Sequence, residues 1–173
     1  ARCRRGVRPR AGDGAGLAVV EDAAGGRSAP GSGLGVVGGT APVGLAPAVV
    51  GVLAGTGLPL EVTVLAVGEN ATLVGAAALG SRLSVSILAP VDDLAALMGR
   101  QDLVISAAGT SVWELCCMGV PMAVVWAVDN QREGYDRVVA AGAALGLGAG
   151  PGMVGPEPRG DGGAVALLRT VLT

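Results

Sequence analysis

The organisation of this chain is clearest in residues 103–115, which read LVISAAGTSVWEL. Three large apolar residues come first, small residues follow them, and Thr110 and Ser111 precede a second apolar segment. Continuous apolar runs are typical of parallel strands that helices cover on both faces. A strand that passes through a short loop of small residues into a helix predicts a βαβ unit.

The same alternation of short apolar runs and Ala/Leu/Val-rich segments continues on both sides of this stretch. We expect strands at residues 34–37, 61–67, 83–88, 103–106, 122–126 and 144–147. We expect helices at residues 46–54, 71–79, 92–98, 111–118, 132–141 and 164–171. The pattern predicts an α/β fold with a doubly wound, mostly parallel, Rossmann-like sheet of about six strands. Such sheets bind ligands at the carboxyl ends of their strands, so the loops after strands are the candidate sites.

The length of 173 residues fits one domain of ordinary size. Residues 1–32 are rich in Gly and Arg, which predicts a linker or the remnant of a preceding domain, and residues 33–173 form the folded domain. The net charge of −2 argues against a nucleic-acid partner. Residues 28–60 carry no charge, but their prolines and glycines argue against a transmembrane segment.

The sequence lacks two residue types that many mechanisms need. It contains no His, and all 12 of its basic residues are Arg. A His general base, a Ser-His-Asp triad, a His-bearing zinc site and a P-loop lysine are therefore excluded within this chain. The three cysteines have neither metal nor disulfide spacing, which favours reduced thiols and a cytoplasmic location. We expect no metal and no cofactor, and we expect at least one of the adjacent Cys116 and Cys117 to face the core.

The first candidate loop follows the strand at 34–37. Residues 33–38 match GxGxxG by letters, but the strand lies inside the pattern instead of before it, which argues against a dinucleotide site. In the following Gly38-Gly39-Thr40, the glycines allow close backbone approach and the Thr40 hydroxyl can donate to a phosphate or sugar. A plain strand-to-helix turn explains the same residues.

The second candidate loop contains Gly109, Thr110 and Ser111. A helix that starts here presents unpaired N–H groups and the positive end of its dipole, which suit a diphosphate. Glu114, one turn later, can accept hydrogen bonds from two ribose hydroxyls. The alternative is a capping box, in which Thr110 or Ser111 caps the helix and Glu114 is its partner. We expect Trp113 to pack against other residues instead of stacking on a base.

The third candidate loop follows the strand at 122–126. Asp129, Asn130 and Gln131 offer carboxylate and amide groups that suit sugar hydroxyls. The alternative is a solvated loop in which Asp129 caps the next helix.

Residues 102–131, DLVISAAGTSVWELCCMGVPMAVVWAVDNQ, resemble the C-terminal domain of GT-B-type nucleotide-sugar enzymes. The AGTSxWELC and DNQ elements are most similar to those of the pseudaminic-acid-pathway UDP-sugar hydrolases and the related spore coat polysaccharide biosynthesis proteins. The peptidoglycan N-acetylglucosaminyltransferases are more distantly similar. The resemblance implies that the ligand is a UDP-sugar. It implies that Gly109, Thr110 and Ser111 hold the diphosphate, Glu114 the ribose, the region of Pro90 and Val91 the uracil, and Asn130 with Gln131 the sugar.

The sequence also departs from the hydrolase family. There, a second, N-terminal Rossmann-like domain supplies part of the cleft and a histidine that assists attack by water. This sequence has no histidine, and Ala41 replaces the usual acidic residue after Gly-Gly-Thr. The resemblance therefore implies a UDP-sugar-binding domain that depends on an N-terminal half or a partner chain for catalysis, and no residue here is assigned a catalytic role.

Three functions remain open from the sequence. The first is hydrolysis of a UDP-linked deoxyamino sugar during surface-polysaccharide biosynthesis. The second is donor binding in a GT-B glycosyltransferase that uses a UDP-N-acetylhexosamine. The third is a non-catalytic nucleotide-sugar-binding subunit.

Overall fold

The computed structural model describes residues 32–37, 44–150 and 161–173. Within these ranges the strands are β1 (Ser32–Val37), β2 (Glu61–Leu65), β3 (Ser84–Leu88), β4 (Leu103–Ala107), β5 (Met122–Trp126) and β6 (Leu145–Ala149). The helices are α1 (Leu45–Gly55), α2 (Glu69–Ala78), α3 (Leu94–Met98), α4 (Ser111–Met118), α5 (Arg132–Ala140) and α6 (Asp161–Leu172), with a short 3₁₀ helix, η1 (Asp129–Gln131), before α5.

The strands form one parallel sheet in the order β3-β2-β1-β4-β5-β6. The chain runs outward from β1 through β2 to β3, and then returns to place β4 on the other side of β1. This is a doubly wound order whose topological switch point lies between β1 and β4. The predicted fold class and the six strands are confirmed.

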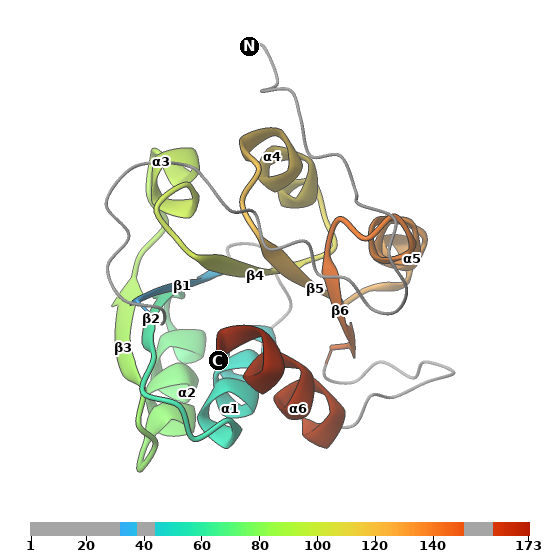
Figure 1. Cartoon of the computed structure of the whole chain (residues 1–173). Coiled ribbons are helices and arrows are strands. Elements are labelled where there is room, and N and C mark those ends of the chain that lie inside the picture. Colours follow the sequence, from blue (N-terminus) through green and yellow to red (C-terminus); the bar gives the residue numbers. More distant parts are fainter. Residues whose placement is uncertain (1–31, 38–43, 151–160) are drawn as a thin grey trace.

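Helices cover both faces of the sheet. In Figure 1, α1, α2 and α6 lie on one face, and α3, α4 and α5 lie on the other. Successive residues of a strand point to opposite faces, so β4 and β5 contribute to both cores. Ile105 and Val125 pack with α1 and α6, whereas Val104 and Val124 pack with α4 and α5. Burial on both faces explains why these strands are apolar along their whole length.

Several predicted boundaries agree closely with the structure. The strand predicted at 122–126 coincides with β5, and the helix predicted at 111–118 coincides with α4. Gly119 ends α4 with a φ of +68°, and Gly142 follows α5 with a φ of +67°. Both are the left-handed positions that glycine favours at helix C-termini.

Most other predicted boundaries differ from the structure by one to three residues, and two of these differences have an identifiable physical cause. Strand β2 ends at Leu65, which pairs with the last residue of β3, so Val67 lies exposed in the following loop. Helix α3 begins at Leu94 because Asp93 caps it: its Oδ1 accepts a hydrogen bond of 2.9 Å from the N–H of Ala96. Strand length therefore depends on the partner strand, and helix start depends on the cap.

The expectation that one of the adjacent cysteines faces the core is wrong. Cys116 and Cys117 are both exposed. The buried residues of α4 are Val112 and Leu115, one turn apart on the face toward the sheet. The buried stripe of this eight-residue helix is narrow, and both cysteines lie outside it.

Strand β6 contains a β-bulge that links it to α5. Gly146 and Gly148 pair with consecutive residues of β5, so Leu147 between them is the extra residue. Gly148 has a φ of +95°, a conformation that favours glycine. Its N–H donates a hydrogen bond of 2.9 Å to the hydroxyl of Tyr135 in α5.

In the part of the chain that the structure describes, no helix is both long enough and apolar enough to cross a membrane. The linker predicted at residues 1–32 lies outside the described residues, except that Ser32 already belongs to β1. The pattern resembling GxGxxG starts inside β1, so its first glycines belong to the strand and not to a loop after it.

The packing of β6 against α5 predicts opposite effects of two glycine substitutions. Gly146→Ala is expected to lower the free energy of unfolding by about 1–3 kcal/mol, because the added methyl group overpacks the site. That methyl would lie 2.5 Å from the Tyr135 hydroxyl oxygen and 3.0 Å from Val139 Cγ2. Moving the ring away would break its hydrogen bond to Gly148.

Gly51→Ala in α1 is the matched control. A methyl group at this position meets no atom within 4 Å, so alanine is expected to raise the free energy of unfolding by about 0.5–1 kcal/mol through its better helix propensity. Urea denaturation measures both variants, and effects of the same sign would contradict the packing described.

Candidate functional site

The carboxyl ends of β1, β4 and β5 lie next to one another at one edge of the sheet. Val37 of β1 pairs with Ser106 of β4, and Ala107 of β4 pairs with Val125 of β5. The loops that follow these strands therefore leave the sheet at the same edge. Doubly wound sheets bind ligands in the crevice at this edge, beside the switch point.

The first predicted loop cannot be placed at this edge in detail. Gly39 and Thr40 lie outside the described residues. Their role in binding stays a prediction.

The loop from β4 to α4 is a tight turn fixed by main-chain hydrogen bonds. The N–H of Ala108 donates to the carbonyl of Val125 at 2.7 Å, which ties the turn to β5. The N–H of Gly109 donates to the carbonyl of Ala107, also at 2.7 Å. Gly109 is half-buried and Thr110 is exposed, so the turn rises from the core to the surface.

The first turn of α4 leaves two amide donors uncommitted. The N–H groups of Val112 and Trp113 donate to the carbonyls of Gly109 and Thr110, at 3.3 and 3.0 Å. Among the described residues, no hydrogen bond uses the N–H of Thr110 or Ser111. These two donors lie at the positive end of the helix dipole, where an anion is stabilised.

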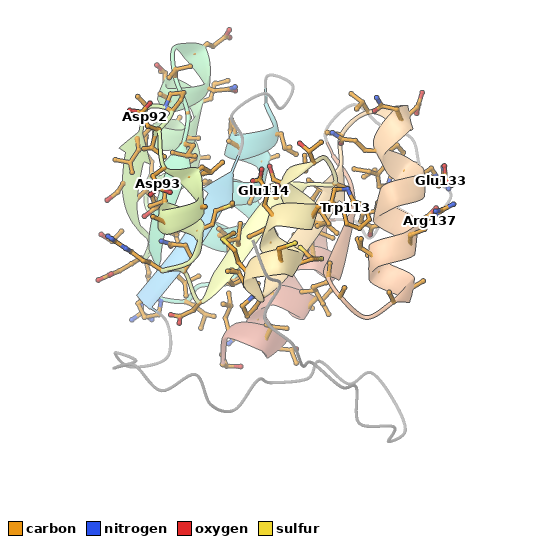
Figure 2. The ribbon with its side chains drawn as sticks, turned by 90° about the horizontal axis from the view of Figure 1, so that it is seen from above. Asp92, Asp93, Trp113, Glu114, Glu133 and Arg137 are labelled. Atoms are coloured by element: carbon orange, nitrogen blue, oxygen red, sulfur yellow. The ribbon has the colours of Figure 1, made fainter. Side chains whose placement is uncertain are left out.

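The structure does not form the capping box that was the alternative explanation of this segment. Thr110 occupies the N-cap position, and its side chain makes no capping hydrogen bond. Ser111 is already the first helical residue. Glu114 is exposed, and Figure 2 shows its side chain beside α4. Its carboxylate is therefore accessible to a ligand.

Gln131 connects the loop after β5 to the loop after β4. Its Oε1 accepts a hydrogen bond of 2.9 Å from the N–H of Ala127. Its Nε2 lies 3.7 Å from the position that a Cβ would occupy on Gly109. Gly109 and Gln131, which the sequence placed in two separate candidate loops, are neighbours in space.

The remaining polar residues of the third loop form η1, a 3₁₀ turn where the sequence predicted a loop. Asp129 and Asn130 are both exposed. The N-cap of η1 is Val128 and that of α5 is Gln131, and neither position has a side-chain capping bond. The alternative in which Asp129 caps the next helix is therefore not formed.

Val91 lies on the same edge of the sheet but farther from the switch point. It is in the turn between β3 and α3, and its side chain is 37% exposed. Two strands, β2 and β1, separate β3 from β4. Figure 2 shows the neighbouring Asp92 and Asp93 beside α3, apart from Glu114 on α4. The structure thus brings Gly109 and Gln131 together and leaves Val91 separate from them.

The expectation that Trp113 packs against other residues is wrong. Its side chain is 60% exposed, because Val112 and Leu115 occupy the face of α4 toward the sheet. In Figure 2 Trp113 lies on the side of α4 toward α5. Side chains of helices lean toward the helix N-terminus, so the indole leans toward the candidate site.

Arg132 was not among the residues predicted from the sequence, and the structure places it next to Gln131 at the start of α5. Its guanidinium carbon lies 5.3 Å from the centroid of the Trp126 ring. Its position directly after Asp129, Asn130 and Gln131 was the signal that could have identified it. Within the described ranges, no group of three or more Cys, Asp or Glu side chains could hold a metal ion.

Comparison with known proteins gives a partial sequence match and similarity in fold to solved structures. No family model matches the chain. The spore coat polysaccharide biosynthesis protein SpsG of Bacillus subtilis is 41% identical over 59 residues, which are 34% of this chain and 17% of SpsG. The crystal structure of MurG from Acinetobacter baumannii matches with a TM-score of 0.68 and 19% identity, over 85% of this chain and 43% of the MurG chain.

The chain therefore spans less than half the length of either protein. Its α/β fold is that of part of MurG, a GT-B protein, and part of its sequence is similar to a polysaccharide biosynthesis protein. The resemblance to GT-B-type nucleotide-sugar enzymes is confirmed at the level of the fold.

The different exposures of the two tryptophans predict different costs of removing them. Trp113→Ala is expected to change the free energy of unfolding by less than about 0.5 kcal/mol, as for other surface substitutions. Trp126 is 5% exposed, so Trp126→Ala is expected to cost about 3–5 kcal/mol. Thermal or urea denaturation measures both, and a loss of stability in Trp113→Ala as large as in Trp126→Ala would show that Trp113 is a packing residue.

Proposed function

We propose that this chain binds a UDP-sugar at the carboxyl edge of its sheet, as the nucleotide-sugar-binding domain of a surface-polysaccharide biosynthesis enzyme. The observation that carries the proposal is the pair of uncommitted N–H groups at the start of α4, with Gln131 beside them. The similarity to SpsG supports the polysaccharide class. The fold shared with MurG supports a nucleotide-sugar domain.

Each part of the ligand has a matching group on this edge. The diphosphate accepts hydrogen bonds from the N–H groups of Thr110 and Ser111, as anions do at helix N-termini. The Glu114 carboxylate accepts hydrogen bonds from the ribose hydroxyls, and Asn130 and Gln131 bind the sugar. Val91 contacts the uracil, and Gly39 with Thr40 completes the diphosphate site from the loop after β1.

The proposed reaction is hydrolysis of a UDP-linked deoxyamino sugar. A water oxygen forms a bond to the anomeric carbon, and the bond from that carbon to the diphosphate oxygen breaks. The bonding electrons leave with UDP, and a base takes the proton of the attacking water. The amide donors and dipole at the start of α4 stabilise the charge that develops on the leaving diphosphate.

The base that accepts this proton lies outside the chain in this proposal. The sequence has no His, which is the side chain whose ordinary pKa suits general-base catalysis near neutral pH. Asp129, the acidic residue of the third loop, is exposed to water, and the proposal gives it no catalytic role. An N-terminal Rossmann-like half or a partner chain supplies the base.

The match to MurG favours glycosyl transfer as a second candidate function. The donor site would be the same, and a hydroxyl of an acceptor sugar would replace the attacking water. The product distinguishes the two reactions, because hydrolysis yields free sugar and transfer yields a new glycosidic bond.

The proposed site predicts that the chain distinguishes UDP from uridine. We expect UDP to bind at least about ten-fold more tightly, which corresponds to about 1.4 kcal/mol of binding free energy from the diphosphate. Isothermal titration calorimetry with the two ligands measures this difference. Equal affinities would mean that the diphosphate is not recognised and would overturn the proposal.

Glu114→Ala tests the ribose contact in the same assay. It is expected to weaken UDP and uridine alike by about 1–3 kcal/mol, because both contain the ribose hydroxyls. The 2′-deoxy analogue of UDP should be less affected. Glu133→Ala is the matched control, since Glu133 is exposed on the outer side of α5 (Figure 2) and should leave both affinities unchanged.

The proposal that the base lies outside this chain predicts binding without turnover. Incubated with UDP-N-acetylhexosamines, the 173-residue chain is expected to release UDP no faster than the uncatalysed background. Addition of an N-terminal half that bears a histidine should start the release. Sustained release by the chain alone that disappears in Asp129→Asn would show instead that Asp129 is the base.

A further inference from the structure

Arg132 occupies a helix position that does not suit a positive charge. It is the first residue of α5, where the helix dipole favours anions and disfavours cations. The acidic residues Asp129 in η1 and Glu133 in α5 follow that preference, and Arg132 between them does not. Helix electrostatics therefore does not explain this arginine.

Two contacts hold the side chain of Arg132 in place. Its guanidinium carbon is 5.3 Å from the ring centroid of Trp126, the last residue of β5, in a cation–π contact. Its Nε is 3.9 Å from a carboxylate oxygen of Asp136, one turn along α5. Trp126 is almost fully buried, whereas the Arg132 side chain is 42% exposed. The ring thus supports the guanidinium from the protein side and leaves it accessible to a ligand.

The described charged residues near the candidate site are mainly acidic, so Arg132 is a source of positive charge there. Glu114 and Asp129 are exposed carboxylates on α4 and η1, near the carboxyl edge. The other arginines in the described ranges are Arg82 and Arg100, each before the start of a strand, Arg137 in the second turn of α5 and Arg169 in the last turn of α6. Among the described residues, Arg132 is the arginine that begins a helix on the carboxyl side of a strand, separated from the end of β5 by five residues and directly after η1.

We infer that Arg132 is the residue that neutralises the diphosphate of a nucleotide bound at this edge, with Trp126 as its positioning residue. A guanidinium presents two parallel N–H groups that match two phosphate oxygens. The residue before it, Gln131, already borders Gly109 of the loop that leads into α4. The diphosphate would thus lie between the amide donors of α4 and the guanidinium of α5. The inference rests on the proposed function and adds the source of positive charge to it.

The experiment compares UDP and uridine binding to the full chain and to four variants. Arg132→Gln is expected to weaken UDP binding at least ten-fold and to leave uridine binding unchanged. Arg132→Lys keeps the charge without the planar fork, so an intermediate loss is expected. Arg137→Gln is the matched control, because Arg137 lies on the same helix, also pairs with a carboxylate one turn away, and points outward in Figure 2. Its UDP and uridine affinities should equal those of the wild type.

The outcomes separate this inference from the function on which it rests. If the wild type does not prefer UDP to uridine, the proposed function fails and the role of Arg132 fails with it. If the wild type has that preference and Arg132→Gln retains it, the assignment of Arg132 alone is wrong.

Trp126→Phe keeps an aromatic face beneath the guanidinium and is expected to retain most of the preference for UDP. A preference for UDP that survives in Arg132→Gln but is lost in Arg137→Gln would place the recognised charge on the outer side of α5 and also overturn the inference.

Discussion

The position of the candidate site depends on the burial of β4 and β5 between two layers of helices. Val104 and Ile105 point to opposite faces, and both are almost completely buried. A shift of one residue in register would turn each of them toward the wrong core. The register that satisfies both cores also aligns the ends of β1, β4 and β5. The apolar packing of the two cores therefore fixes the position of the polar groups at the carboxyl edge of the sheet.

Much of the fold could be predicted from the sequence because the two cores depend on the apolar pattern that the sequence displays. Strand β5 and helix α4 are examples, since both are bounded by clear changes of residue type. The details that differ depend on contacts between elements. The end of β2 is set by the length of β3, and the bulge of β6 involves a hydroxyl from α5. Neither contact has a signature in the local sequence.

The sequence predicted which loops form the candidate site, but it did not predict which residues of these loops are in contact. Parallel strands end at a common edge, so the sequence could place Gly109 and Gln131 there, but not next to each other. For both Thr110 and Asp129, the sequence is equally compatible with a helix cap and with a ligand-binding residue. The hydrogen bonds at the helix starts show that neither side chain forms a cap. The cation–π contact of Arg132 depends on how α5 lies over the end of β5, which no local pattern records.

The contact between Gly146 and Tyr135 has a consequence for how related chains can vary. The tyrosine hydroxyl reaches into the space beside β6 that any side chain at position 146 would fill. A chain that carries a larger residue at 146 therefore needs a shorter one at 135, and it must satisfy the N–H at position 148 in another way. Positions 135 and 146 should covary across homologues, and the pair would mark those whose sixth strand has the same bulge.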